Sequence, residues 1–247
     1  MKKYWTLFKV DLANSLEYRG FLIIWILTEL VSLFSAIFLW TAIFRTNNMV
    51  GSYDRQKMLT YYLLLPTVGG LVSTFISERL PKMIKDGEIS VDLLKPYSFA
   101  TSMMIRNLGV KVVQQVFKIP IYIAVLYFGA IIFDLHLALG WLSAGVVIAV
   151  LAYFLNFWLS YSLSMAAFWM DDIWALSLLN TVMLLIFGGL SFPIDIVPTS
   201  FRWLFNLLPF RLIYYFPVSV AQGRFDYPDV FVGLVHMVIW LSFFCLL

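Results

Sequence analysis

Long apolar runs separated by short polar segments dominate the chain. A helix rises 1.5 Å per residue, so crossing about 30 Å of hydrocarbon takes roughly 20 apolar residues. The pattern predicts an all-α polytopic membrane protein, a single domain over residues 1–247. Its six expected spans are residues 21–44, residues 58–76, a helix that ends before Asp134, a helix that follows a turn near residues 136–140, residues 173–194 and residues 230–247.

The third span is the least regular of the six. Residues 119–133 are too few to cross, so this helix must begin earlier and include Lys118 and Lys111. We expect the long side chains of these two lysines to reach the membrane interface, because a charge inside hydrocarbon is costly.

Composition supports a lipid environment. The chain of 247 residues is 62% hydrophobic and 13% charged, whereas soluble domains carry about 25% charged residues. The net charge is only +3, in scattered basic patches, which argues against a nucleic-acid partner. Cys245 is the single cysteine, which excludes a disulfide framework or a thiolate metal site within one chain.

The distribution of basic residues predicts the orientation. With six spans both termini lie on one side, and eleven basic residues fall on that side: Lys2, Lys3, Lys9, Arg19, Arg79, Lys82, Lys85, Lys95, Arg106, Lys111 and Lys118. Six fall on the other: Arg45, Arg55, Lys57, Arg202, Arg211 and Arg224. Cytoplasmic loops carry the excess of Lys and Arg. We therefore expect a multi-pass protein of the cell membrane with a cytoplasmic N-terminus.

Residues 1–18 do not span. Trp5, Phe8, Leu12 and Leu16 recur at helical spacing, and most basic side chains lie elsewhere around the helix. This pattern is typical of an amphipathic helix lying flat in the membrane interface. A disordered tail is the alternative.

A charged segment, KDGEISVDLLKPYS, lies within residues 77–106 between two apolar runs. A short apolar helical face precedes Gly87, which stands where a helix C-terminal cap is expected. Leu93 and Leu94 then extend a second apolar patch that Pro96 ends. A compact helical element with an apolar face outside the bilayer favours docking into a protein groove. A solvated connector is the alternative interpretation.

Residues 191–228 are aromatic and rich in proline. No unbroken helix of spanning length fits among their five prolines, which are Pro193, Pro198, Pro209, Pro217 and Pro228. Irregular backbone at membrane depth persists only where protein or a water-lined cavity satisfies it. We expect a re-entrant helical hairpin that enters the outer leaflet and returns before the last span.

Two patches resemble the type-2 permease family of ATP-binding cassette (ABC) transporters, and specifically its bacterial branch with stand-alone six-span membrane subunits. The first is similar to the family's G-E-x-x-x-x-L-L-x-P loop and comprises Gly87, Glu88, Leu93, Leu94 and Pro96. The second is similar to its proline-rich hairpin and comprises Gly189, Pro193, Pro198, Leu208, Pro209, Phe210, Pro217 and Gly223. The resemblance, including the flat N-terminal helix, extends over essentially the whole chain.

The resemblance implies a permease that is not itself an enzyme. Its first cytoplasmic loop would be a coupling helix that enters a separate ATP-binding cassette ATPase subunit, present in two copies. ATP and Mg²⁺ would be bound there, with no cofactor on this chain. A second permease chain, identical or homologous, would complete a dimeric exporter for efflux. The residues agree on one point: no Gly-Lys pair occurs, so the chain has no phosphate-binding loop of the G-x-x-x-x-G-K-[ST] type.

Other functions remain open from the residues alone. A proton-coupled secondary transporter is the main alternative, because Glu29 lies inside the first span and an intramembrane carboxylate is usually functional. His236 in the last span could join it in a translocation path if the fold brings them together. A membrane enzyme using Asp171 and Asp172 as metal ligands is disfavoured, because adjacent residues on a helix point apart. A structural or anchoring protein would leave the proline-rich hairpin unexplained.

Overall fold

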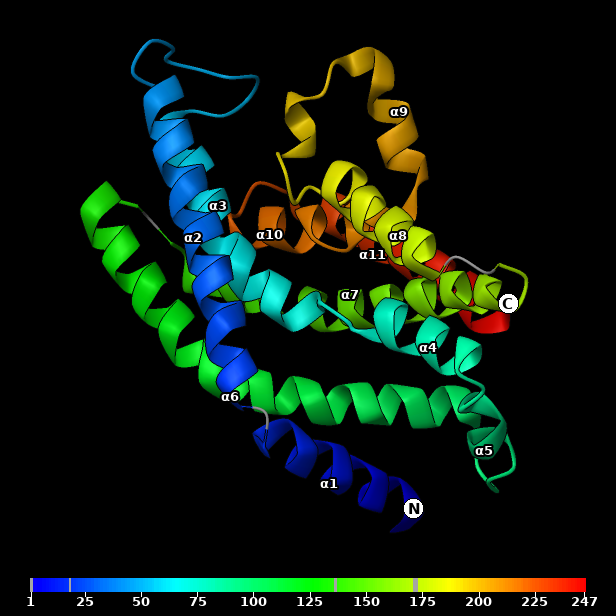
Figure 1. Ribbon diagram of the computed structural model, residues 1–247. Helices are drawn as coiled ribbons and strands as arrows, with labels where there is room; N and C mark the ends of the chain where they lie inside the picture. Colours follow the sequence, from blue (N-terminus) through cyan, green and yellow to red (C-terminus); the bar gives the residue numbers. More distant parts are fainter. Residues whose placement is uncertain (1, 18, 136, 171–172) are drawn as a thin grey trace.

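The computed structural model describes residues 2–17, 19–135, 137–170 and 173–247. Within them the chain is helical, and the exception is an isolated β-bridge between Val50 and Tyr53. The expected all-α class is therefore confirmed for the described part of the chain. Figure 1 shows the long helices crossing one another, with the N-terminal helix below them and a pair of short helices above.

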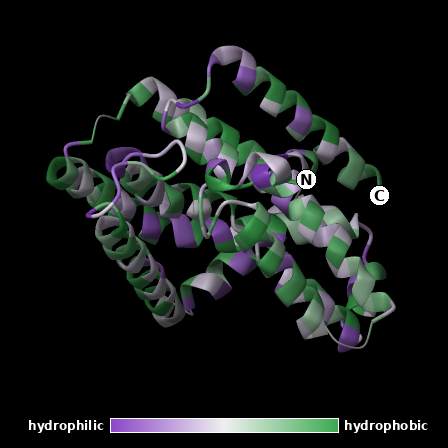
Figure 2. Cartoon of the chain, turned by 90° about the horizontal axis from the view of Figure 1, so that it is seen from above, coloured by the Kyte–Doolittle hydropathy of each residue, from purple (hydrophilic) through white to green (hydrophobic). Residues whose placement is uncertain are grey.

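Five stretches of the described chain are helical, long and apolar enough to cross a membrane. They are α2 (Arg19–Ile43), α3 (Arg55–Val72) together with α4 (Ile76–Lys85), α6 (Phe99–Phe133), α7 (Leu139–Met165) with the short helix after it, and α11 (Tyr227–Leu246). Hydrophobic residues predominate along these helices, and hydrophilic ones occur both in the connections and at scattered helix positions (Figure 2). The count reaches six only if the bent pair described below is one span.

The full-length fifth span expected over residues 173–194 is not found. Helix α8 covers Ile173–Phe187, 15 residues, which corresponds to about 22 Å. Gly188 and Gly189 follow it, and Gly189 has a φ of 88°, a conformation that a residue with a Cβ adopts only with strain. The chain therefore turns away from the helix axis seven residues earlier than hydrophobicity alone indicates.

The proline-rich segment of residues 191–228, called the hairpin below, contains only short helices, as expected, and its entry into the outer leaflet stays a prediction. They are α9 (Thr199–Leu207), the 3₁₀ turn Pro209–Leu212 and α10 (Tyr215–Ala221), preceded by the 3₁₀ turn Ile194–Ile196. The chain bends by 79° between Thr199–Leu207 and Pro209–Ala221. Pro209 stands at this bend, where its missing N–H and fixed φ suit the start of a new turn.

Helix α7 lies at the centre of the packing. It contacts α3, α4, α10 and α11, and Ala149, Ala152 and Leu155 on it are completely buried. Small side chains allow α10 to approach closely: a Cβ added at Gly145 would lie 2.5 Å from the Cβ of Ala221. This contact places the short helices of the hairpin directly against the central span.

Helix α1 (Lys2–Glu17) confirms the helix expected near the N-terminus. It packs along the first half of α6 (Figure 1). Its buried face differs from the expected apolar stripe, because Asp11 is buried whereas Trp5 and Leu16 are exposed. Asp11 forms an ion pair of 3.4 Å with Arg79 of α4. The helix is thus held by protein contacts, and its position in the membrane interface stays a prediction.

Candidate coupling surface and translocation cavity

The segment over residues 77–106 folds into two short helices with a sharp turn between them. Helix α4 ends at Lys85, Gly87 has a φ of 75°, and α5 (Ile89–Leu93) begins two residues later. The N–H of Gly87 donates to the carbonyl of Ile84, as a helix C-terminal cap requires. The inner faces of both helices join a small core formed by Ile76, Leu80, Met83, Ile89, Met103 and Phe157.

The outer face of α5 is apolar and uncovered. Leu93 is 58% exposed and Leu94 is 87% exposed. The other three residues expected at a coupling surface, Gly87, Glu88 and Pro96, are exposed as well. The structure therefore brings the five sequence-predicted residues together on one projecting element, which Figure 1 shows at the edge of the molecule.

Charges stabilise this projecting element from behind. Asp92 is buried, and its Oδ1 lies 2.5 Å from the ammonium of Lys95 and 3.4 Å from the guanidinium of Arg106. The hydrogen bond to Asp92 raises the pKa of Lys95. A pocket of about 440 Å³ opens beside these groups and is lined also by Arg79 and Lys82.

Helix α1 reaches the same element. The ammonium of Lys3 donates to the carbonyl of Pro96, and the N–H of Ser98 donates to the hydroxyl of Tyr4 at 3.3 Å. The rings of Tyr4 and Tyr97 lie 6.0 Å apart between centroids. The loop that follows α5 is therefore attached to the N-terminal helix as well as to α6.

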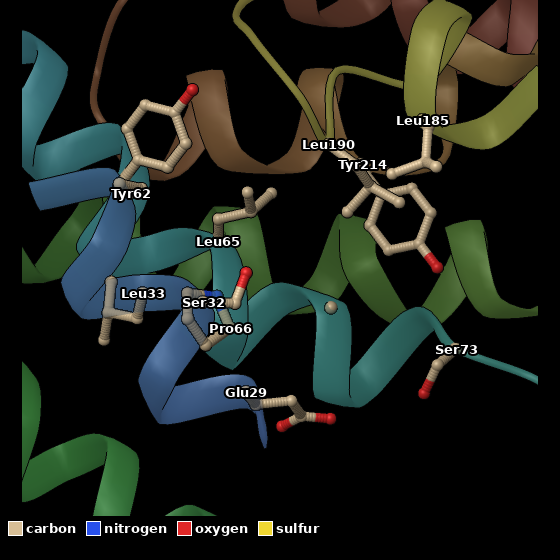
Figure 3. A pocket seen from close by; sticks show the side chains of 12 residues that line it. Glu29, Ser32, Leu33, Tyr62, Leu65, Pro66, Ser73, Leu185, Leu190 and Tyr214 are labelled. Atoms are coloured by element: carbon tan, nitrogen blue, oxygen red, sulfur yellow. The ribbon is translucent and has the colours of Figure 1, made fainter. Parts of the chain in front are cut away.

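A cavity of about 290 Å³ lies between α2, α3, α8 and the hairpin (Figure 3). Its lining is mostly apolar, with a few hydroxyl groups and one carboxylate: Glu29, Ser32, Leu33, Ala36, Tyr62, Leu65, Pro66, Gly69, Ser73, Leu185, Leu190 and Tyr214. Figure 3 shows the side chains of Glu29 and Ser73 on the same side of the cavity. Such a cavity can hold an amphipathic molecule, with its apolar part against the leucines.

Glu29 is held by two side chains of α6. Its Oε1 lies 2.5 Å from the Lys118 ammonium, and its Oε2 accepts a hydrogen bond from the Tyr122 hydroxyl. The expectation that Lys118 and Lys111 extend to the membrane interface is wrong, because both are buried. Inside the bundle Lys118 pairs with Glu29, and the ammonium of Lys111 donates to the carbonyl of Ser73.

The structure does not bring His236 to Glu29. The ring Nε2 of His236 accepts a hydrogen bond of 2.9 Å from the indole N–H of Trp240 on the same helix, α11. His236 is not among the residues that line the cavity, whereas Glu29 is. A direct relay between these two side chains therefore has no support in the fold.

An ion-pair cluster joins the hairpin to the loop between α2 and α3. The guanidinium of Arg224 lies 3.0 Å from the carboxylate of Asp195 and 3.9 Å above the ring of Tyr53. The Tyr53 hydroxyl donates to Asp195 at 3.3 Å, and Arg224 donates to the hydroxyl of Ser52. Burial is the main cause that raises the pKa of Tyr53 well above its usual range, so the phenol remains a neutral donor.

Most of the hairpin residues expected from the resemblance are packed inside. Gly189, Pro193, Pro209, Phe210 and Pro217 are buried, whereas Pro198 and Gly223 are exposed. The Tyr61 hydroxyl donates to the Gly189 carbonyl at 2.6 Å, and the Tyr62 hydroxyl donates to the Ser191 carbonyl at 2.7 Å. Tyrosines of α3 thus satisfy carbonyls that the irregular backbone leaves without helical partners.

No group of three or more potential metal ligands occurs in the described parts of the chain. Three positions from the sequence analysis lie outside the described residues. They are the two candidate metal ligands, Asp171 and Asp172, and His136 at the expected turn.

Comparison with known protein families decides the class. The family described as "ABC-2 family transporter protein" matches residues 30–247, which includes both resemblance patches. The chain belongs to the ABC-2 transporter family. Searches of curated proteins and of solved structures found no match.

As an ABC-2 family member, this protein is a multi-pass membrane protein and a permease. Membership implies association with an ATPase subunit, and membrane subunits of this family are typically non-catalytic. The match begins one residue after Glu29, so α1 and Glu29 lie outside it. Their roles rest on the contacts of this chain.

Sequence reasoning missed several residues that organise these sites. It singled out Glu29 but not its partner Tyr122, and it counted Arg224 only as a topological charge. The one available signal was that Tyr122 lies one helical turn after Lys118, on the same face of α6. Nothing in the sequence pairs Asp195 with Arg224.

Proposed function

We propose that this chain is the permease subunit of an ATP-driven exporter, and that residues 77–106 are the coupling loop that engages a separate ATPase subunit. ATP and Mg²⁺ are bound by that subunit, present in two copies, while this chain forms the translocation path. The loop and the N-terminus face the cytoplasm, in agreement with the excess of basic residues on that side.

The observation that carries the proposal is the exposure of two leucines on the projecting element. Leu93 is 58% exposed and Leu94 is 87% exposed. The inner side chains of the same segment, such as Leu80, are fully buried. Exposed apolar side chains clustered on a short rigid helix are typical of a surface that a partner covers. The buried Asp92, with Lys95 and Arg106, keeps the presenting helix in place.

The cavity beside Glu29 supports the transport role. It lies along α3, the helix that leads through α4 into the coupling loop. Movement of that loop can therefore reach the cavity wall through a continuous chain segment. A second permease chain, identical or homologous, would enclose the path, as the family resemblance implies.

A proton-coupled secondary transporter that uses Glu29 is less well supported. The Glu29 carboxylate is engaged by the Lys118 ammonium and the Tyr122 hydroxyl, both on α6. His236, the other candidate for a relay, is bonded elsewhere.

The test is purification of the tagged protein from its native membrane in a mild detergent, with identification of the proteins that accompany it. The wild type should recover an ATP-binding cassette subunit. Leu94→Asp places a charge on the apolar surface and should abolish this recovery while the permease still inserts and purifies.

The matched control is Leu139→Asp, at a leucine that is 83% exposed at the start of α7, away from the coupling loop. It should retain the ATPase subunit. Equal recovery with Leu94→Asp would overturn the assignment of the loop, and a wild-type protein without any ATPase partner would overturn the proposed function.

A further inference from the structure

The second span is interrupted where it approaches the coupling loop. Helix α3 ends at Val72 and α4 begins at Ile76, with three residues between them. A helix end leaves carbonyls without intrahelical partners. Inside a membrane protein such groups must find other donors, because unpaired carbonyls are costly there.

Three side chains from two other helices donate to these carbonyls. Gln115 of α6 donates to the carbonyl of Gly70 at 2.5 Å, and Asn156 of α7 donates to Val72 at 3.0 Å. The ammonium of Lys111, also on α6, donates to the carbonyl of Ser73. The last turn of α3 and the residue after it are thus held by donors on α6 and α7.

The next residue is fixed in the same way. The hydroxyl of Thr74 accepts from the side-chain amide of Asn107 at 3.3 Å and from the N–H of Ile76 at 3.2 Å. Asn107 in turn accepts from the Tyr153 hydroxyl at 3.0 Å. These bonds determine the direction in which the chain leaves α3 and enters α4.

Lys111 is the most costly member of this set. Its side chain is buried, and no carboxylate pairs with it in the described residues. Two features compensate: it lies at the C-terminal end of α3, where the helix dipole is negative, and 4.7 Å above the ring of Tyr153. A buried charge that replaces a neutral donor needs a reason beyond hydrogen bonding, because a glutamine could donate to the same carbonyl.

The interruption separates the two functional regions. Gly69 on α3 and Ser73, the first residue of the interruption, line the cavity. On the α4 side, ten residues of helix lead to Gly87 and then to the exposed Leu93 and Leu94. Any displacement of the coupling loop that reaches the cavity wall along the chain must pass through residues 73–75.

We infer that Lys111, Gln115 and Asn156 are positioning residues that clamp the α3–α4 junction, so that displacement of the coupling loop moves the cavity wall instead of bending the junction. This inference rests on the proposed function. In it, the side-chain nitrogen of Lys111 is tethered at the C-terminal end of a half-helix, a place where other transporters hold a free cation. Loss of the clamp should uncouple ATP hydrolysis from movement at the cavity.

The experiment measures cavity movement directly and requires no cargo. A cysteine at Ser32, which lines the cavity from α2, is introduced together with Cys245→Ser. The permease–ATPase complex in lipid nanodiscs is treated with a water-soluble maleimide, without nucleotide and after trapping with ATP, Mg²⁺ and vanadate. In the wild-type background the two labelling rates should differ by tenfold or more.

Lys111→Met should reduce this difference at least fivefold while ATPase binding and basal hydrolysis persist. Lys111→Arg, which keeps the charge, should restore it. Lys57→Met is the matched control, because Lys57 lies at the other end of α3 with an exposed side chain, and it should leave the difference unchanged. If Lys111→Met fails to assemble, Gln115→Leu tests the same clamp without deleting a charge. It should reduce the difference in labelling rates by a smaller factor.

An undiminished nucleotide-dependent difference in Lys111→Met, or in Gln115→Leu if only that variant assembles, would overturn the inference and leave the proposed function standing. A Lys111→Arg variant as defective as Lys111→Met would also overturn the role of the charge. A wild-type protein with no ATPase partner and no nucleotide-dependent labelling is a different result, which would overturn the proposed function and this inference together.

Discussion

The ammonium of Lys118 on α6 lies 2.5 Å from a carboxylate oxygen of Glu29 on α2. Tyr122, one helical turn after Lys118, donates to the other carboxylate oxygen. A charged side chain inside an apolar span is costly, and the contact between Glu29 and Lys118 gives each of these groups a partner. The pair joins α2 to α6 at the edge of the cavity that Glu29 lines.

Removing one member of this pair should destabilise the protein, because the remaining charge loses its partner. Breaking a buried pair costs about 3–5 kcal/mol, and we expect less here because the Glu29 side chain is about one-third exposed. Lys118→Met should therefore lower the Tm in detergent clearly. The double variant with Glu29→Gln should recover much of the loss, since no unpaired charge remains. A double variant as unstable as Lys118→Met would contradict this account.

Gly189 should tolerate no side chain. Its φ is 88°, and an added Cβ would lie 2.7 Å from the Tyr61 hydroxyl oxygen. Gly189→Ala should cost about 2 kcal/mol or more, which corresponds to a Tm decrease of roughly 4–8 °C. Thermal unfolding followed by size-exclusion chromatography measures it. Gly140→Ala is the control, because no atom lies within 4 Å of an added Cβ there, and its Tm should not fall.

The Arg224–Asp195 pair should hold the loop between α2 and α3 against the hairpin. Arg224→Gln leaves Asp195 without its cation and removes the stacking on Tyr53. We expect amide hydrogen exchange at Val50 and Tyr53, whose backbones bond to each other, to accelerate at least tenfold. The exposed Arg55 provides the control, and Arg55→Gln should leave exchange unchanged. Equal exchange rates in the two variants would show that the pair does not stabilise the loop.

The positions of most spans could be predicted from the sequence, because each is a long apolar run with polar residues at its ends. The fifth was not, since residues 173–194 read as continuous apolar sequence while the backbone leaves the helix at Gly188 and Gly189. Two glycines inside an apolar run give a weak signal. The turn depends on tertiary contacts, the Tyr61 hydroxyl in particular.

The projecting element around α5 was easier to predict than the interior of the bundle. Gly87, Leu93 and Leu94 are close in sequence, so their local pattern carries the information. The bonds of Lys118 and Lys111 join residues 89 and 38 positions apart. Helix packing decides these pairs, and a single sequence contains no measure of it. The expectation that both lysines reach the membrane interface was therefore wrong.

The short helix α8 has a consequence for the way this part of the chain can cross a membrane. At 15 residues it extends about 22 Å, about 8 Å less than the usual hydrocarbon thickness. A helix of this length cannot complete a crossing alone, so the segment that follows the turn at Gly188 and Gly189 must supply the remaining depth.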